Sequence, residues 1–263
     1  MAFLTTAPLP IAGLILLGGG PLLAMLATFL VRSHVALDTL RANNEVAGFK
    51  FSTLGMLYGV LLAFAVLVVW GELNDAQGNV AIEAGAAATM FRLANGLEGE
   101  AGASVHAAMS AYLDSAIHED WPAMERGGES TATSAGLDRV YAALLAYEPV
   151  PPGGAALLAE SLRQADVLTQ ARRARIVVAD GVVPGVVWFV LIVGAFVTIA
   201  FTFFFGTANI RAQVWMTGAL SMLICSCLLI IVAIDRPFAG MVKLEPEPLV
   251  AVLRNSGAAG LRP

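Results

Sequence analysis

A line of acidic and amide side chains follows directly on an apolar stretch. In the run VVWGELNDAQGNVAIEAG, residues 68–85, intervals of three, four and four residues separate Glu72, Asp75, Asn79 and Glu83. Residues at such intervals share one face of a helix, and neither a proline nor a turn dipeptide separates them from the apolar stretch. Carboxylates in a row can pair with arginine or attract cations. The spacing therefore predicts one unbroken helix that carries a polar stripe out of an apolar layer.

The far end of this stripe has candidate partners elsewhere in the chain. A basic cluster just before a later apolar stretch contains Arg172, Arg173 and Arg175. If two helices leave their apolar stretches side by side, at about 1.5 Å per residue, Glu83 and this cluster reach the same height. Because the guanidinium fork binds carboxylate bidentately, we expect a structural network of Glu83 with these arginines.

The near end of the stripe predicts a different role. Glu72 and Asp75, with Asn79 one turn further on, have no basic residue at an obvious matching height unless the C-terminal segment with Lys243 folds back. In a homo-oligomer, acids repeated around a pore mouth form rings that concentrate cations. These three residues are therefore candidate pore or ion-contacting residues, with ion pairing inside the chain as the alternative.

Patterns typical of enzymes and metal sites are absent from the sequence. There is no G-x-S-x-G, H-E-x-x-H or Walker loop. The segment HEDW, residues 118–121, could offer metal ligands, but adjacent side chains on a helix diverge, which favours a solvated helix end. Cys225 and Cys227 lie two residues apart in an apolar run, where buried thiols are a better interpretation than a disulfide or metal pair. We expect neither catalysis nor a cofactor.

Composition places the chain in a membrane. Of the 263 residues, 58% are hydrophobic and 13% charged, whereas soluble domains have about a quarter charged residues; the mean hydropathy is +0.76. The net charge of −5 offers no basic patch for nucleic acid. A membrane-spanning helix needs about 20 apolar residues, and four stretches qualify: 11–31, 51–70, 182–206 and 214–234. The fold class is therefore an all-α integral membrane protein, with the lipid bilayer as a partner.

The segment between the second and third spans forms a domain of its own. It is rich in Ala, Leu, Glu and Arg and lacks the alternation of strands, which predicts an α-helical extramembrane domain. Helices are expected at 71–97, 101–118, 134–147 and 155–178, with Gly, Pro and Ser between them. The expected domains are a first transmembrane pair, the helical domain, a second pair and a C-terminal tail, at residues 1–70, 71–180, 181–236 and 237–263.

Two proline-containing segments should shape the spans. The run GGGP, Gly18 to Pro21, is expected to weaken or kink the first span, because proline removes a helical hydrogen bond. In DRPFAG, residues 235–240, Pro237 should end the fourth span and leave Phe238 at headgroup depth. Both features are structural.

The second span contains a G-x-x-x-G motif. Gly55 and Gly59 lie four residues apart, with Tyr58 beside them. Small residues at this spacing let helix backbones approach closely. The motif predicts helix packing either within the chain or between copies of it.

Basic residues in short loops indicate the cytoplasmic side of a membrane protein. The loop after the first span carries three of them, Arg32, Arg41 and Lys50, whereas the residues before that span carry none. This favours an extracytoplasmic helical domain, although the basic cluster before the third span and Arg236 and Lys243 after the fourth indicate the reverse.

Six segments carry a resemblance to a known family. They are NNEVAGF, LGMLYGVLLAFAVLVVW, EAGAAATMFRLANGL, ARRAR, AFTFFFG and DRPFAGMVKLEPEP, in this order. With them the chain, from about residue 30 to 253, resembles the bestrophin-like domain family of bacteria and plants. The resemblance implies paired spans that flank a helical domain, and the family name suggests a channel related to bestrophins, which are pentameric anion channels. The acidic stripe favours cations instead.

Taken with the residues above, the resemblance predicts a homo-oligomeric ion channel or pore-like protein that favours cations over anions. Its second span would line or border the axis, inorganic ions would be its partners, and a bacterial inner membrane would be its location. The alternative is a non-conducting membrane scaffold or sensor whose helical domain binds a partner or ligand.

Overall fold

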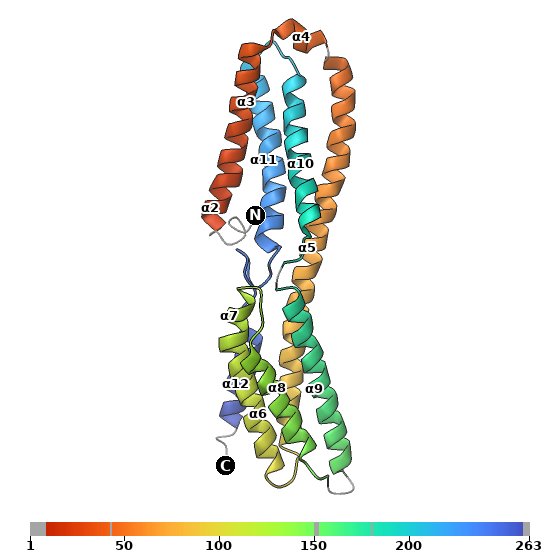
Figure 1. Cartoon of the computed structure of the whole chain (residues 1–263), viewed down its shortest axis with the longest axis vertical. Coiled ribbons are helices and arrows are strands. Elements are labelled where there is room, and N and C mark those ends of the chain that lie inside the picture. The colour runs from red at the N-terminus through yellow and green to blue at the C-terminus, as the bar shows by residue number, and fades with distance from the viewer. Residues whose placement is uncertain (1–8, 43, 150–152, 180, 260–263) are drawn as a thin grey trace. The chain divides into compact units, whose positions relative to one another are not determined.

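The computed structural model describes residues 9–42, 44–149, 153–179 and 181–259, and every regular element among them is helical. Two compact units share the chain (Figure 1). The first unit contains Met1–Gly71, Val182–Asp235 and Gly240–Val242, and the second contains Glu72–Gly181, Arg236–Ala239 and Lys243–Pro263. Helix α5, Asn44–Ala94, is continuous and contributes to both.

The first unit contains the apolar helices. Four of the described segments are long and apolar enough to cross a membrane, at Pro10–His34, Asn44–Ala94, Gly185–Phe204 and Ile210–Ile234. The first of these comprises α2 (Leu9–Gly13), η1 (Leu14–Gly19) and α3 (Gly20–His34); α4 (Leu37–Ala42) then leads into α5. The third comprises α10 (Gly185–Phe201) with η3 (Thr202–Phe204), and the fourth is α11 (Ile210–Ile234). The predicted all-helical fold with four possible spans is therefore confirmed.

The first span contains a π-helical stretch before its proline. Over η1 the helix widens, and the backbone N–H of Gly20 bonds to the carbonyl of Ile15, five residues back. Pro21 follows and has no N–H to donate, and inserted residues of this kind are a common cause of helix irregularity. The weakness expected at GGGP thus takes the form of a π turn. A Cβ at Gly20 would lie 2.7 Å from Sγ of Cys225, so this glycine lets α3 approach α11 closely.

Helix α11 is the central helix of the first unit. It packs mainly against α3, where a Cβ at Gly218 would lie 2.8 Å from the sulfur of Met25. Fifty-six per cent of its most apolar stretch is buried, against 22% for α5 and for Gly185–Phe204 and 17% for the first span. The other spans therefore present most of their apolar surface away from their own chain.

Side chain to backbone hydrogen bonds hold the two ends of α10 in place. At one end the Asn44 amide donates to the carbonyl of Gly206 (2.8 Å) and its oxygen accepts from the N–H of Gly206 (2.9 Å). At the other end the Asp235 carboxylate accepts from the N–H of Val183 (2.8 Å). Gly206 also approaches Leu40, where a Cβ would lie 2.7 Å from the Leu40 side chain. The motif residues Asn44, Gly206 and Asp235 thus position the loops between the spans.

The second unit is a bundle of antiparallel helices around one core (Figure 1). After α5 come α6 (Ala101–Ser115), η2 (Ala116–Asp120), α7 (Trp121–Met124), α8 (Thr131–Leu145), α9 (Gly154–Val177) and α12 (Glu247–Ala259). Helices α6 and α8 pack tightly, because a Cβ at Gly136 of α8 would lie only 3.4 Å from the Tyr112 backbone. Ser130 caps α8 by accepting from the N–H of Thr133. These helices supply the core that holds the charged residues described below.

The C-terminal segment differs from the expected tail. Phe238 is fully buried in the second unit, edge-on to Trp121 at 5.7 Å between ring centres, so its expected position at headgroup depth was wrong. The indole N–H of Trp121 donates to the carbonyl of Leu244 (3.0 Å), and Leu249 of α12 is also fully buried. Aromatic and leucine side chains gain more from this core than from solvent, so Arg236–Ala239 and the residues from Lys243 onward complete the second unit.

Candidate functional site

Helix α5 buries one continuous seam along its length. The buried residues, which largely follow the helical period, include Tyr58, Leu62, Ala65, Val69, Ala76, Val80, Ala87, Met90 and Ala94. Apolar side chains away from the seam remain uncovered, and Leu57, Phe64 and Leu67 are 63–66% exposed. The exposed flank of a helix with this composition faces lipid or another protein chain.

The polar stripe runs along the edge of the seam and divides there. Glu83 is fully buried, Glu72 and Asn79 are half-buried, and Asp75 is exposed. At 3.6 residues per turn, Glu83 lies nearly two turns beyond the buried Ala76 and points the same way. Asp75 is one residue from Ala76 and points about 100° away from it. Residues of one sequence pattern therefore lie in two environments, because Glu83 is buried and Asp75 is exposed.

Glu83 belongs to a buried ion cluster, which consists of Glu83, Asp120, Arg172 and Arg175. Its carboxylate accepts from Nε of Arg175 at 2.9 Å and from Nη2 at 3.1 Å. The Tyr112 hydroxyl donates to the same carboxylate at 2.7 Å. Arg175 therefore binds Glu83 bidentately, the geometry in which an arginine–carboxylate pair is strongest.

Asp120 joins the two arginines of the buried ion cluster. It accepts from Nε and Nη2 of Arg172 at 2.8 and 3.0 Å, and from Nη2 of Arg175 at 3.3 Å. The backbone N–H of Ser130 also donates to it at 2.8 Å, while Arg172 donates to the Ser130 carbonyl at 3.3 Å. The cluster thereby ties α5, η2 and α9 to the start of α8.

The surroundings of the cluster stabilise its charged form. Burial alone would lower the pKa of the Arg175 guanidinium, but Glu83, Tyr112 and Asp120 raise it overall. Burial, and then the Glu83 charge, raise the pKa of Tyr112 well above its ordinary value, so this hydroxyl stays a donor. The Arg175 guanidinium carbon also lies 4.4 Å from the centre of the Trp121 ring. With both Glu83 oxygens occupied by donors, the cluster suits a structural role better than proton transfer.

The basic cluster predicted from the sequence, like the polar stripe, contains both buried and exposed residues. Arg172 and Arg175 are buried three residues apart, whereas Arg173 is exposed and has no ion pair among the described residues. Asp120 was missed, because HEDW was expected to be a solvated helix end. The π turn of η2 brings Asp120 and Trp121 into the core and leaves His118 exposed. No sequence signal for this extra residue per turn was visible.

The motif residues of the second span also serve different surfaces. The Tyr58 hydroxyl donates to the Leu191 carbonyl of α10 at 2.8 Å, and its ring occupies the space where a Cβ at Gly194 would lie. A Cβ added at Gly55 or Gly59 would meet no atom of a neighbouring described segment within 4 Å. The same is true further along α5, at Gly71, Gly78 and Gly85. Tyr58 therefore packs within the chain, while these glycines leave uncovered backbone on two sides of α5, with Gly55 and Gly59 on one and Gly71, Gly78 and Gly85 on another.

The outer acids of the stripe have no partner within the part of the chain that the structure describes. Neither Glu72 nor Asp75 makes a hydrogen bond or ion pair there. Lys243, which could have folded back to them, instead pairs with Glu125 at 2.7 Å. Their charges are therefore available to ions or to another chain.

Over the described residues, no group of three or more His, Cys, Asp and Glu side chains is placed to hold a metal ion. Cys225 is a buried free thiol, and Cys227 is a half-buried one. In the second unit, the charged side chains with charged partners belong to the buried ion cluster or to ion pairs at the surface.

The fold and these residues define an all-helical, multi-pass membrane protein whose longest helix carries both a buried and an uncovered set of carboxylates. The chain belongs to the Bestrophin-like domain family, whose sequence profile matches residues 18–249. The resemblance noted in the sequence is thereby confirmed. The family is channel-like rather than a family of enzymes. No curated protein and no solved structure matches the chain.

Proposed function

We propose that the protein is a homo-oligomeric membrane ion channel or pore-like protein, in which α5 lines or borders a central axis. The observation that carries the proposal is that α5 leaves its glycines and its outer acids uncovered by their own chain. The family supports a channel-type function in general. Self-association and ion preference are inferred from the side chains of α5.

Self-association follows from the uncovered glycines of α5. Glycines let the backbones of neighbouring helices approach, and in a bilayer such packing, rather than the hydrophobic effect, drives helix association. Gly55 and Gly59 lie on the apolar part of α5 and leave this space unfilled by their own chain. Only 22% of the apolar stretch of α5 is buried within the protomer. A second copy of α5 is the partner that a symmetric assembly would place there.

Cation preference follows from Glu72 and Asp75. These residues come two and five positions after Trp70, at the end of the apolar stretch of one continuous helix. Repeated by symmetry, unpaired carboxylates at a fixed height form a ring that raises the local cation concentration. Asn79, half-buried on the same stripe, would add neutral oxygen and N–H groups to this ring.

The corresponding test replaces the acids by their amides. We expect Glu72→Gln with Asp75→Asn to lower the cation-to-anion permeability ratio of the protein in liposome flux or bilayer recordings. The reduction should be largest at low salt, because the Debye length shortens to about 8 Å at physiological ionic strength. A matched control is Asp138→Asn with Glu148→Gln, which neutralises two exposed acids elsewhere and should leave the ratio unchanged. A conducting double mutant with unaltered selectivity would refute the ring.

A non-conducting scaffold or sensor is the second candidate, and the pocket described below favours it. The two functions differ at the centre of the assembly. Single-particle images of a channel should show symmetry with α5 facing an axial opening, whereas a scaffold can be closed there. If the reconstituted protein passes no ions under any stimulus tested, the scaffold replaces the channel.

The proposed location is a bacterial inner membrane, with residues 71–180 as an extracytoplasmic domain between the second and third spans. This orientation follows from three basic residues after the first span, Arg32, Arg41 and Lys50. We expect cysteines at the exposed positions Ser104 and Asp138 to react with an impermeant maleimide in intact cells. The unaltered chain, whose thiols lie in α11, is the background control. Labelling that requires lysis would establish the inverted orientation.

A further inference from the structure

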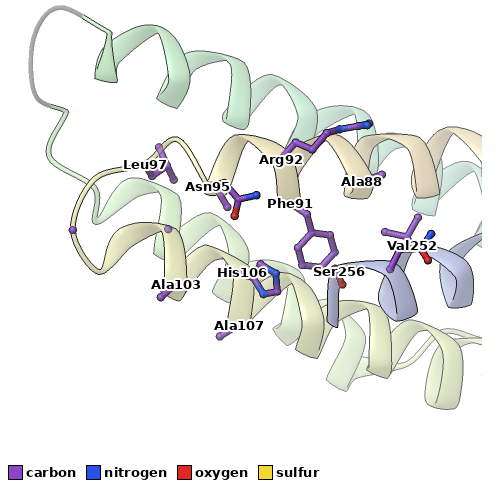
Figure 2. A pocket seen from close by; sticks show the side chains of 14 residues that line it. Ala88, Phe91, Arg92, Asn95, Leu97, Ala103, His106, Ala107, Val252 and Ser256 are labelled. Carbon is purple, nitrogen blue, oxygen red and sulfur yellow. The ribbon is translucent and has the colours of Figure 1, made fainter. Parts of the chain in front are cut away.

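A pocket lies within the second unit, between the end of α5, the start of α6 and the last turns of α12. Figure 2 shows Phe91 projecting from α5 toward α6, with His106 opposite it and Val252 and Ser256 beside it on α12. The volume is about 660 Å³, within the range of about 300–1,000 Å³ typical of small-molecule sites. This space belongs neither to the buried ion cluster nor to the uncovered glycines and outer acids of α5.

The inner wall of the pocket is apolar and aromatic. Phe91 is 6% exposed and Leu97 is 6% exposed, and both line the pocket together with Val252. The rings of Phe91 and His106 are tilted by 60°, with 4.7 Å between their centres. Because Phe91 is almost wholly buried, the half-buried His106 ring supplies most of the aromatic surface on which a flat, largely apolar molecule can stack.

The rim of the pocket carries hydrogen-bonding groups that are not used by the protein. Arg92, Asn95 and Asn255 line it, are exposed, and have no hydrogen bond or ion pair with the rest of the described chain. No carboxylate is among the lining residues, since Glu98 and Glu100 of the adjoining loop are exposed outside the pocket. The fixed charge of the lining is therefore the single positive charge of Arg92.

The first turn of α6 adds donors at the same place. Gly99, with a φ of 67°, turns the chain out of α5, and Gly102 comes so close that a Cβ would overlap the Ala94 carbonyl oxygen. Gly102 and Ala103 both line the pocket, and no side chain caps the N-terminus of this 15-residue helix. Free N–H groups at a helix N-terminus attract anions.

We propose that this pocket binds a small organic anion with a planar ring, such as a nucleoside monophosphate or an aromatic carboxylate. The ring stacks against the half-buried His106, with the exposed part of Phe91 beside it. The anionic group lies between Arg92 and the start of α6, and the amides of Asn95 and Asn255 bond to polar edges of the ring. Three of the lining residues, Val252, Asn255 and Ser256, follow the segment matched by the family, so the pocket is a feature of this chain beyond the channel-type function.

Binding can be measured directly on the full-length protein in lipid nanodiscs by calorimetry, independently of conductance. The probes are AMP and salicylate, with adenosine and salicylamide as uncharged counterparts and inorganic phosphate as an anion without a ring. We expect at least one charged probe to bind, and to bind about tenfold or more tightly than its uncharged counterpart, as loss of a charge-assisted hydrogen bond implies. AMP and salicylate distinguish the phosphate from the carboxylate form of the ligand.

Three variants test the location. Arg92→Gln should lower the affinity for the bound probe about tenfold. Ala107→Phe should abolish binding, because Ala107 is an exposed lining residue of α6 and the larger ring fills the space without entering the core. Arg254→Gln is the control, since Arg254 is an exposed arginine beside Asn255 that does not line the pocket. This variant should bind the probe with unchanged affinity. Failure of both charged probes to bind, equal affinity for the uncharged ones, or full affinity in Ala107→Phe would overturn the proposal.

Discussion

Glu83→Ala is expected to destabilise the purified protein by about 3–5 kcal/mol, as removal of one partner from a buried ion pair does. The reason is the state in which Arg175 is left. This guanidinium is fully buried, and after the substitution it keeps the 3.3 Å contact with Asp120, the sulfur of Met124 and the Trp121 ring, but has lost its bidentate carboxylate. Tyr112 loses its acceptor as well. Unfolding of the full chain in detergent micelles, by denaturant or heat, measures the effect.

The neighbouring arginines provide the controls for this prediction. Arg173→Ala, at an exposed position two residues from Arg175, should change stability by no more than about 0.5 kcal/mol. Glu83→Ala combined with Arg175→Ala should cost clearly less than the sum of the two single changes, because each removes the same pair. Strict additivity would show that Glu83 and Arg175 do not stabilise one another.

Gly194→Ala is expected to cost about 1–3 kcal/mol, the usual range for overpacking. A Cβ at Gly194 would enter the space of the Tyr58 ring. That ring is 7% exposed and is fixed by the hydrogen bond of its hydroxyl to the Leu191 carbonyl. To admit one methyl group, the ring must shift, and α5 must separate locally from α10. Thermal unfolding in detergent shows the loss as a lower melting temperature.

Gly185→Ala is the matched control on α10 itself. Its Cβ meets no neighbouring atom of the described chain within 4 Å, so the protomer should keep its stability. In a Tyr58→Ala background, Gly194→Ala should cost little, because the obstructing ring is gone. An unchanged melting temperature for Gly194→Ala alone would contradict the close packing of these helices.

Much of the fold could be predicted from short-range patterns. Length and hydropathy alone identify the four possible spans, because a bilayer demands about 20 apolar residues whatever surrounds them. The continuity of α5 follows from the absence of any proline or turn dipeptide between Trp70 and Glu83. The helices of residues 71–180 were predicted with ends a few residues from those observed, since caps and glycines mark helix ends only approximately.

The partners of the polar residues were harder to predict. The number of residues between each span and its polar end predicts that Glu83 lies near the basic cluster. It does not predict whether Arg173 or Arg175 is the ion-pair partner, although the two point to opposite sides of α9. Asp120 depends on a π turn that shifts the inward face of the helix, and single-sequence patterns do not reveal such an insertion. The pocket between α5, α6 and α12 arises from residues distant in sequence, so no local motif marks it.

The packing of the C-terminal segment was not predicted, for a simpler reason. Leu249, Val252, Leu253 and Ser256 follow a helical period in the sequence, and the first of them is fully buried. The prolines and glycines on either side of this short segment obscured its apolar face. Phe238 was assigned by its closeness to a span, whereas its contact with Trp121 depends on a residue more than one hundred positions earlier.

Because Phe238 and Leu249 lie in the core of the second unit, this core can be completed only late in translation. Glu83 and Asp120 leave the ribosome before the arginines that neutralise them, and the core residues Phe238 and Leu249 are translated only after all four apolar helices. The second unit of the nascent chain therefore still has an incomplete hydrophobic core while α11, the fourth apolar helix, is inserted into the membrane. Translation that stops after residue 235 would leave Trp121 without its aromatic partner, and cellular proteases would meet an incompletely packed bundle.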